Sequence, residues 1–356
     1  MISTVHFQKR IDKIFKLFQN EESIFDPWRV SHYFYRIEFQ ARGAPHLHCL
    51  IWLVDKEGNP APTYWTPVHL EEKVHPLTLN EFLDTSGTNR LERDSEMLQS
   101  EDKNSDHKID IVSIADQLMC GSLKEARCKE HRVVRESTVS CEECQTIRER
   151  VALFNNHKCT FTCHKKKKLL RIKHNEGHGW KDGKMNDCES IDHICCRFKF
   201  PKFPIDKTTF LLSTRKDLDE KLVIKRRKDL LKIRKYLIRQ TSGERNDKDL
   251  SWKNVQDLTF VEFLREVGMF DSIQNEYNEN EIEKARKRYT DALSVGIKGT
   301  GEVFLQREPK DVFINNYNPN LMKLHEANHD IQIVVDQYAC AEYVCGYLTK
   351  NEAGIS

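Results

Sequence analysis

The stretch IEFQARGAPHLHCLIWL (residues 37–53) tells most about the fold of this 356-residue chain. It spans the end of one segment, 32–40, and most of another, 46–54. Both are rich in aromatic and branched residues; the first nearly alternates apolar and polar side chains and the second is mostly apolar, as in β-strands. The segment ARGAP (41–45) between them has the composition of a turn. Residues 32–54 are therefore predicted to form a β-hairpin.

Two histidines in this hairpin form the sharpest local motif. Residues two apart on a strand point to the same face, so His46 and His48 bring two imidazoles together. Glu38 and Gln40 share a face of the preceding strand, and the hairpin places one of those oxygens beside the imidazoles. Such a set leaves open positions on a divalent ion, which can then polarise a substrate phosphate. An isolated H-x-H pattern on a strand is more often surface decoration or a satisfied pair of histidines, so the pattern alone does not establish a metal site.

A second motif lies near the end of the sequence, where residues 335–350 have the pattern of a helix. Tyr343 and Tyr347 are four residues apart and share one helix face, about 5.4 Å apart along the axis. A tyrosine oxygen can attack a phosphodiester, but its pKa near ~10 requires a neighbouring cation or base. Lys350 lies on roughly the same face and can pair with phosphate. The alternative is a pair of core aromatic residues.

The composition excludes several classes of protein. Charged residues make up 31% of the chain and the net charge is +2, yet 18 Phe, 10 Tyr and 5 Trp are too many for a disordered chain. No apolar run approaches the ~20 residues of a membrane helix. Residues 5–19 are predicted to be an amphipathic helix rather than a secretory signal. The 12 Cys cluster unevenly, which favours metal binding over disulfides in a reducing compartment.

Most cysteines fall in residues 111–200, where the spacing is typical of zinc sites. One structural zinc site is predicted from a C-x-x-C pair and a following His/Cys group: Cys141, Cys144, His157 or Cys159, and Cys163. A second zinc site is predicted from one of two further sets. These are Cys120, Cys128 and His131, or Cys188, Cys195 and Cys196. Unligated reduced thiols are the alternative. Lys165 to Lys168 adjoin this region and suit phosphate contacts.

The remaining segments have patterns of ordinary helices, strands and loops. Residues 221–239 are predicted to be a basic helix that contacts the DNA backbone, acts as a nuclear address or forms a solvated face. Residues 256–292 have helical apolar spacing, followed by a charged helix near 279–293. Residues 302–306 and 329–335 are predicted strands, and 56–110 a polar surface excursion.

Taken together, the two motifs resemble a known family. The stretch 37–53 resembles the HUH-endonuclease signature of Helitron transposases, the rolling-circle Rep domain. Residues 304–356, which end in the two-tyrosine segment of form Y-x-x-x-Y-x-x-K, resemble its downstream block. TFVEFLREVGMF (259–270) and CRFKFP (196–201) also look like landmarks of this family.

The resemblance implies an α+β fold with an antiparallel HUH sheet flanked by helices and a Cys/His-rich insert. His46 and His48 match the metal-binding histidines, with Mg²⁺ or Mn²⁺ as the ion. The third ligand stays open between Gln40, Glu38 and Gln332. Tyr343 and Tyr347 match the nucleophiles. The domain boundaries expected are 1–55 and 301–356 for the two parts of the HUH domain, 56–205 for the excursion and insert, and 206–300 for the basic and helical segment.

The function implied is nicking and strand transfer of single-stranded DNA at transposon ends, in the nucleus and away from membranes. Full Helitron proteins resemble a Rep domain fused to a helicase, but no G-x-x-x-x-G-K-[ST] occurs here. The chain starts at the helix expected after the first strand, so it is expected to be a fragment with the helicase elsewhere. A rolling-circle replication initiator and a non-catalytic, zinc-dependent DNA-binding remnant are the alternatives.

Overall fold

The structure, a computed structural model, describes the following residues: 2–18, 23–39, 45–61, 111–134, 141–160, 162–172, 188–213, 218–240, 253–274, 276–297, 301–335, 340–342 and 345. The elements in chain order are α1 (Ile2–Phe18), β1 (Arg29–Phe39), β2 (Pro45–Val54), α4 (Ile111–Leu118), α5 (Lys129–Val134), α6 (Glu142–Arg150), the π-helical turn η1 (Val151–Asn155), β3 (His164–Ile172), β4 (Cys188–Cys196), β5 (Thr209–Leu212), α7 (Glu220–Arg239), η2 (Val255–Asp257), α8 (Phe260–Glu266), α9 (Glu279–Ser294), β6 (Gly301–Phe304), η3 (Pro309–Asp311) and α10 (Pro319–His325).

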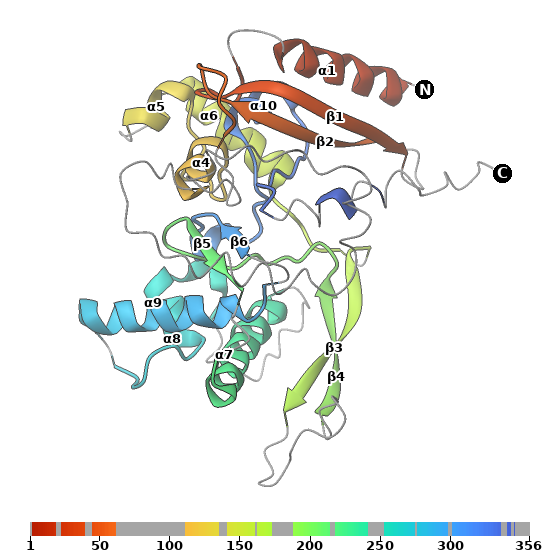
Figure 1. Cartoon of the computed structure of the whole chain (residues 1–356). Helices are drawn as coiled ribbons and strands as arrows, with labels where there is room; N and C mark the ends of the chain where they lie inside the picture. Colours follow the sequence, from red (N-terminus) through yellow and green to blue (C-terminus); the bar gives the residue numbers. More distant parts are fainter. Residues whose placement is uncertain are drawn as a thin grey trace, which may run out of the picture.

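The N-terminal layer consists of α1 packed on one face of the β1–β2 hairpin (Figure 1). The apolar stripe of α1 buries Ile11, Ile14 and Phe18, as the spacing of the predicted helix requires. The Phe15 ring stacks on Tyr33 of β1 with centroids 4.9 Å apart. Helix α4 contributes to the same core. This packing fixes which face of the hairpin is turned toward the core and which is turned away.

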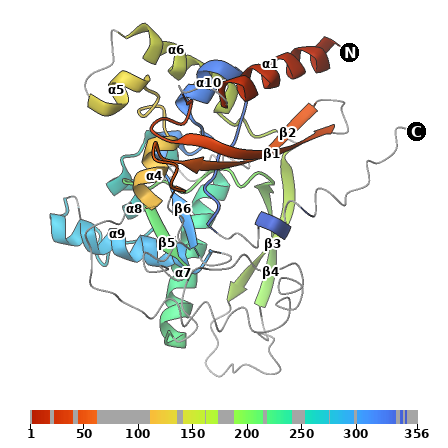
Figure 2. The ribbon, with the colours of Figure 1, turned by 45° about the horizontal axis from the view of Figure 1, so that its top comes forward.

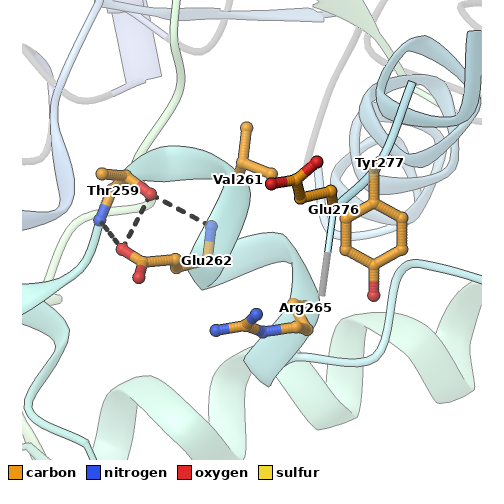
Figure 3. A pocket seen from close by; sticks show the side chains of 6 residues that line it. All are labelled: Thr259, Val261, Glu262, Arg265, Glu276 and Tyr277. Atoms are coloured by element: carbon orange, nitrogen blue, oxygen red, sulfur yellow. Dashed lines mark hydrogen bonds between the residues drawn. The ribbon is translucent and has the colours of Figure 1, made fainter. Parts of the chain in front are cut away.

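The helices α7, α8 and α9 form a second core, around Ile233, Phe263 and Tyr289. Helix α8 begins with a capping box, drawn in Figure 3, in which Glu262 accepts from the Thr259 backbone and Thr259 Oγ1 accepts from the Glu262 backbone. A carboxylate joins two of the helices, because Asp229 of α7 accepts two hydrogen bonds from Arg288 of α9 at 2.7 and 2.9 Å. Strands β5 and β6 pair antiparallel beside this bundle.

One buried arginine, Arg307, makes hydrogen bonds to several segments at the centre of the molecule. The Arg307 side chain is 3% exposed and donates to the carbonyls of Gly121, Asp311 and Ile314 and to Asn316 Oδ1. The close approach explains the glycine, since a Cβ at position 121 would lie 2.8 Å from the guanidinium. Burial lowers the pKa of Arg307 to about 10, which leaves it charged at neutral pH.

The β3–β4 hairpin extends away from the body of the molecule beside α7, as both views of the ribbon show (Figures 1 and 2). Its register pairs His164 with Cys196 at the base and Ile172 with Cys188 at the far end. A buried cluster made of Cys163, Cys196 and Phe200 lies at the base of this hairpin.

The α+β class predicted from the sequence is confirmed, as are the helices near 5–19, 221–239 and 279–293 and the hairpin over 32–54. Within the described ranges the strands form three separate two-stranded antiparallel sheets, so a continuous HUH sheet stays an expectation. None of the helices described is long and apolar enough to cross a membrane.

One predicted strand is wrong in the structure. Residues 329–335 have no regular secondary structure, although their exposure alternates as in a strand, with Ile331 and Ile333 half-buried and Gln332 and Val334 exposed. The alternation comes from packing on the N-terminal core rather than from pairing with a neighbouring strand. Most of the excursion expected at 56–110 lies outside the described residues.

Candidate metal centres

The hairpin register places the two histidines as the sequence predicts. Glu38 lies opposite His46, and Arg36 lies opposite His48. The imidazole centroids of His46 and His48 are 4.7 Å apart, with the rings inclined at 76°. His48 Nε2 lies 3.4 Å from Glu38 Oε2. Two imidazoles and a carboxylate therefore share one face of the hairpin.

The opposite face of the hairpin explains this orientation. Leu47, Cys49 and Ile51 pack toward α1, so the period of two along β2 turns His46 and His48 away from the core. Burial raises the pKa of the Cys49 thiol to about 12, which keeps it neutral and apolar in character. The histidines are thus accessible to a ligand, with His46 exposed and the His48 side chain 20% exposed.

Of the three candidate third ligands, the structure brings Glu38 to the histidines. Gln40 lies outside the described residues. Gln332 is exposed, and its amide donates to Asp330 at 2.7 Å. Two imidazoles and a carboxylate are ligand types that bind divalent metal ions in proteins. The donor atoms of these three residues do not all lie within 4.8 Å of one another, so at least one of the side chains would have to move to close around an ion.

A much closer set of donors surrounds the start of α6: Cys128, His131, Cys141 and Cys144, whose ligand atoms all lie within 4.8 Å of one another. Cys128 Sγ is 3.0 Å from His131 Nδ1 and 3.9 Å from Cys141 Sγ. Two sulfurs bound tetrahedrally at 2.3 Å from Zn²⁺ would be about 3.8 Å apart. The spacing of this first cluster therefore fits zinc.

A second set lies at the base of the β3–β4 hairpin: His157, Cys159, Cys163 and Cys196, again within 4.8 Å. Cys196 Sγ is 3.2 Å from His157 Nε2, and the Thr160 backbone donates to Cys163 Sγ at 3.3 Å. Burial, with a contribution from Lys202, lowers the pKa of His157, so the imidazole is neutral and able to coordinate a metal. This second cluster joins the two strands of the hairpin where they leave the body.

The division between the two clusters differs from the one expected. Cys141 and Cys144 were expected to share a site with Cys163, but α6 and η1 together make a helical segment from 142 to 155, about 20 Å long. The cysteine pair lies at its start and His157 follows its end, so they belong to different clusters. Cys128 and His131, assigned to a further site, complete the first cluster instead.

The other cysteines named for zinc are placed as follows. Cys120 is buried outside both clusters, where its Sγ contacts the Glu125 carbonyl at 3.5 Å, and burial raises its pKa to about 12. The side chains of Cys188 and Cys195 lie outside what the structure describes, although both residues are at backbone positions of β4.

The tyrosine motif also falls outside the described residues, so the roles of Tyr343, Tyr347 and Lys350 stay predictions. Residues 340–342 and 345, on either side of Tyr343, are helical. These four residues lie inside the helix predicted over 335–350, whereas Val335 at the start of that range is in a bend.

These observations define an α+β protein with an outward-facing histidine pair and two Cys/His clusters that could hold a metal such as zinc. Comparison with protein families matches residues 1–51 to the Helitron helicase-like domain at N-terminus. The match covers α1, β1 and most of β2, including His46 and His48, and it supports a Helitron-related protein. Neither the curated proteins nor the solved structures give a match to the chain.

Proposed function

We propose that the chain is a metal-dependent, HUH-type endonuclease that nicks and transfers single-stranded DNA in rolling-circle transposition. The observation that carries the proposal is the hairpin register, which aligns His46, His48 and Glu38 on one face within the part that matches the Helitron-related domain. A divalent ion, Mg²⁺ or Mn²⁺, held there would polarise the scissile phosphate.

The chemistry on the protein side requires a nucleophile and a leaving group. A Tyr343 or Tyr347 oxygen would attack the phosphorus and form a 5′-phosphotyrosine, while the bond to the 3′ oxygen breaks and that oxygen leaves as a 3′-OH. The proton released by the phenol balances the proton gained by the leaving oxygen. Because the ester conserves the phosphodiester energy, a free 3′-OH can reverse the reaction and rejoin the strand without ATP.

The proposal is tested with end-labelled single-stranded DNA and Mn²⁺. Loss of both imidazoles in His46→Ala/His48→Ala should lower the nicking rate at least about 100-fold, the scale of losing a group that stabilises the transition state. His32→Ala, on the same face of the hairpin but opposite Trp52, is the matched control and should retain the rate of the parent. Equal nicking by the double variant and the parent would refute the metal role of the pair.

The two Cys/His clusters favour one rival function, a zinc-dependent DNA-binding protein without catalysis. Four-donor clusters with closed geometry are typical of structural rather than catalytic zinc. This rival predicts that the parent binds DNA but never forms a covalent adduct, whatever divalent ion is supplied.

A further inference from the structure

Helix α7 carries a concentration of positive charge that the proposed chemistry does not use. Its 20 residues include nine Lys or Arg and two acidic residues, whereas the whole chain has a net charge of only +2. The rest of the chain is therefore slightly acidic, and the positive field is centred on this helix.

The positive residues are arranged by the helical period. Leu230, Ile233 and Leu237 face the core that α7 shares with α8 and α9. On the opposite side, intervals of four, three, four, three and four residues put one cation on each turn, within about 40° of a single line. This basic stripe consists of Lys221, Lys225, Lys228, Lys232, Lys235 and Arg239, and it spans about 27 Å along the axis.

Two carboxylates that pair with cations of α7, Asp229 and Asp291, lie on the side that faces α9. Asp229 is buried and accepts a hydrogen bond from Arg288. Lys232 also contacts Asp229, at 3.3 Å, but the lysine side chain is 55% exposed. Arg226, which is not in the stripe, pairs with Asp291 of α9 at 2.9 Å. Helix α9 is built differently, because its Arg286 is paired with Glu279, Glu283 and Asp206. Five of the six stripe residues are exposed, all except the partly buried Lys228, whereas Arg286 and Arg288 of α9 are paired with carboxylates.

We propose that the basic stripe binds the sugar-phosphate backbone of single-stranded DNA, an inference that rests on the proposed function for the choice of strand. A line of one cation per turn matches a linear polyanion, and it has no amide or aromatic group to read bases. Binding should therefore be independent of sequence and steeply dependent on salt. The β3–β4 hairpin, whose sequence includes Lys165 to Lys168, projects beside α7 (Figures 1 and 2).

The test measures the affinity of the full, zinc-loaded chain for a fluorescent 20-nucleotide oligo-dT at several salt concentrations, in a buffer without added Mg²⁺ or Mn²⁺. The stripe variant is Lys221→Gln/Lys225→Gln/Lys235→Gln, all exposed positions. The control, Lys207→Gln/Lys284→Gln/Lys287→Gln, removes the same charge from exposed lysines elsewhere. Losing three phosphate contacts should reduce the slope of log K against log salt by roughly 2 and weaken binding at least about ten-fold at 50 mM salt.

Several results would overturn the inference. They are a stripe variant that binds like the control, a parent that does not bind the oligonucleotide, or a parent that binds polyglutamate peptide to the exclusion of DNA. The melting temperature of each variant is measured alongside, so that loss of fold is not mistaken for loss of binding. Because this buffer lacks the ion that nicking requires, the assay measures binding alone. A parent that binds through the stripe here but does not nick DNA when Mn²⁺ is supplied would refute the proposed function and leave this inference standing.

Discussion

The division of ligands between the two Cys/His clusters can be tested by combining substitutions in pairs. In the structure Cys141 and Cys128 belong to the first cluster, and Cys163 belongs to the second. Cys128→Ser/Cys141→Ser therefore damages one cluster, whereas Cys141→Ser/Cys163→Ser damages both. If the alternative grouping of Cys141 with Cys163 were correct, the two double variants would give the opposite pattern.

The expected magnitudes follow from the geometry. The parent should bind two Zn²⁺ per chain, the first double variant one, and the second double variant none. Each site should show three sulfurs at about 2.3 Å and one nitrogen at about 2.0 Å, consistent with the 3.9 Å separation of the Cys128 and Cys141 sulfurs. Structural zinc sites contribute on the order of 10 kcal/mol of binding free energy to folding, so each lost site should also lower the melting temperature.

The assay is native mass spectrometry of freshly purified, reduced protein, with X-ray absorption at the zinc edge for the ligand set. Two zinc ions in the parent and the sequence two, one, none across the three proteins would confirm the division. A parent free of zinc would mean that these are reduced thiols. One zinc in Cys141→Ser/Cys163→Ser, with none in Cys128→Ser/Cys141→Ser, would refute the grouping given by the structure.

Two further predictions concern stability. Burial lowers the pKa of His329 to about 4, below the ~6.5 of an unfolded histidine, so its contribution is fully present above pH 6.5 and is lost as the pH falls toward 4. In urea unfolding, this residue should make the free energy of unfolding about 2 kcal/mol lower at pH 5 than at pH 7. His329→Gln should remove that part of the difference. If the variant keeps the pH dependence of the parent, the prediction is wrong. Arg307→Met strips the buried carbonyls of their cation and should cost about 3–5 kcal/mol in the same assay, whereas Lys124→Met at the surface should cost less than about 1 kcal/mol. A loss from Arg307→Met no greater than that from Lys124→Met would show that the buried guanidinium is dispensable.

The local parts of this fold could be predicted from the sequence because they follow a short period. The alternation around His46 and His48 gave the hairpin and its outward face, and the helical spacing of 221–239 gave α7. Both depend on contacts between residues close in the chain. The same logic misread 329–335, because alternation reports which side chains are buried but not whether a partner strand is present.

The grouping of the cysteines depended on longer-range geometry. The spacing of Cys141, Cys144 and Cys163 suggested a single site, but a spacing rule assumes a loop between the ligands. Residues 142–155 form a helical segment instead, which their apolar residues Ile147, Val151 and Phe154 could have indicated. No sequence pattern indicates the buried role of Arg307, because its partners Gly121 and Asn316 are brought to it only by the tertiary structure.

The central claim, that this chain cuts DNA through tyrosine, is tested most directly by isolating the covalent intermediate. The parent is incubated with Mn²⁺ and a randomised pool of single-stranded oligonucleotides labelled at the 3′ end, the end that stays with a 5′-phosphotyrosine. The account predicts a labelled protein band on a denaturing gel, mass spectrometry that locates the nucleotide on Tyr343 or Tyr347, and no band from Tyr343→Phe/Tyr347→Phe. A parent that forms no adduct, or a double variant that forms as much as the parent, would contradict it.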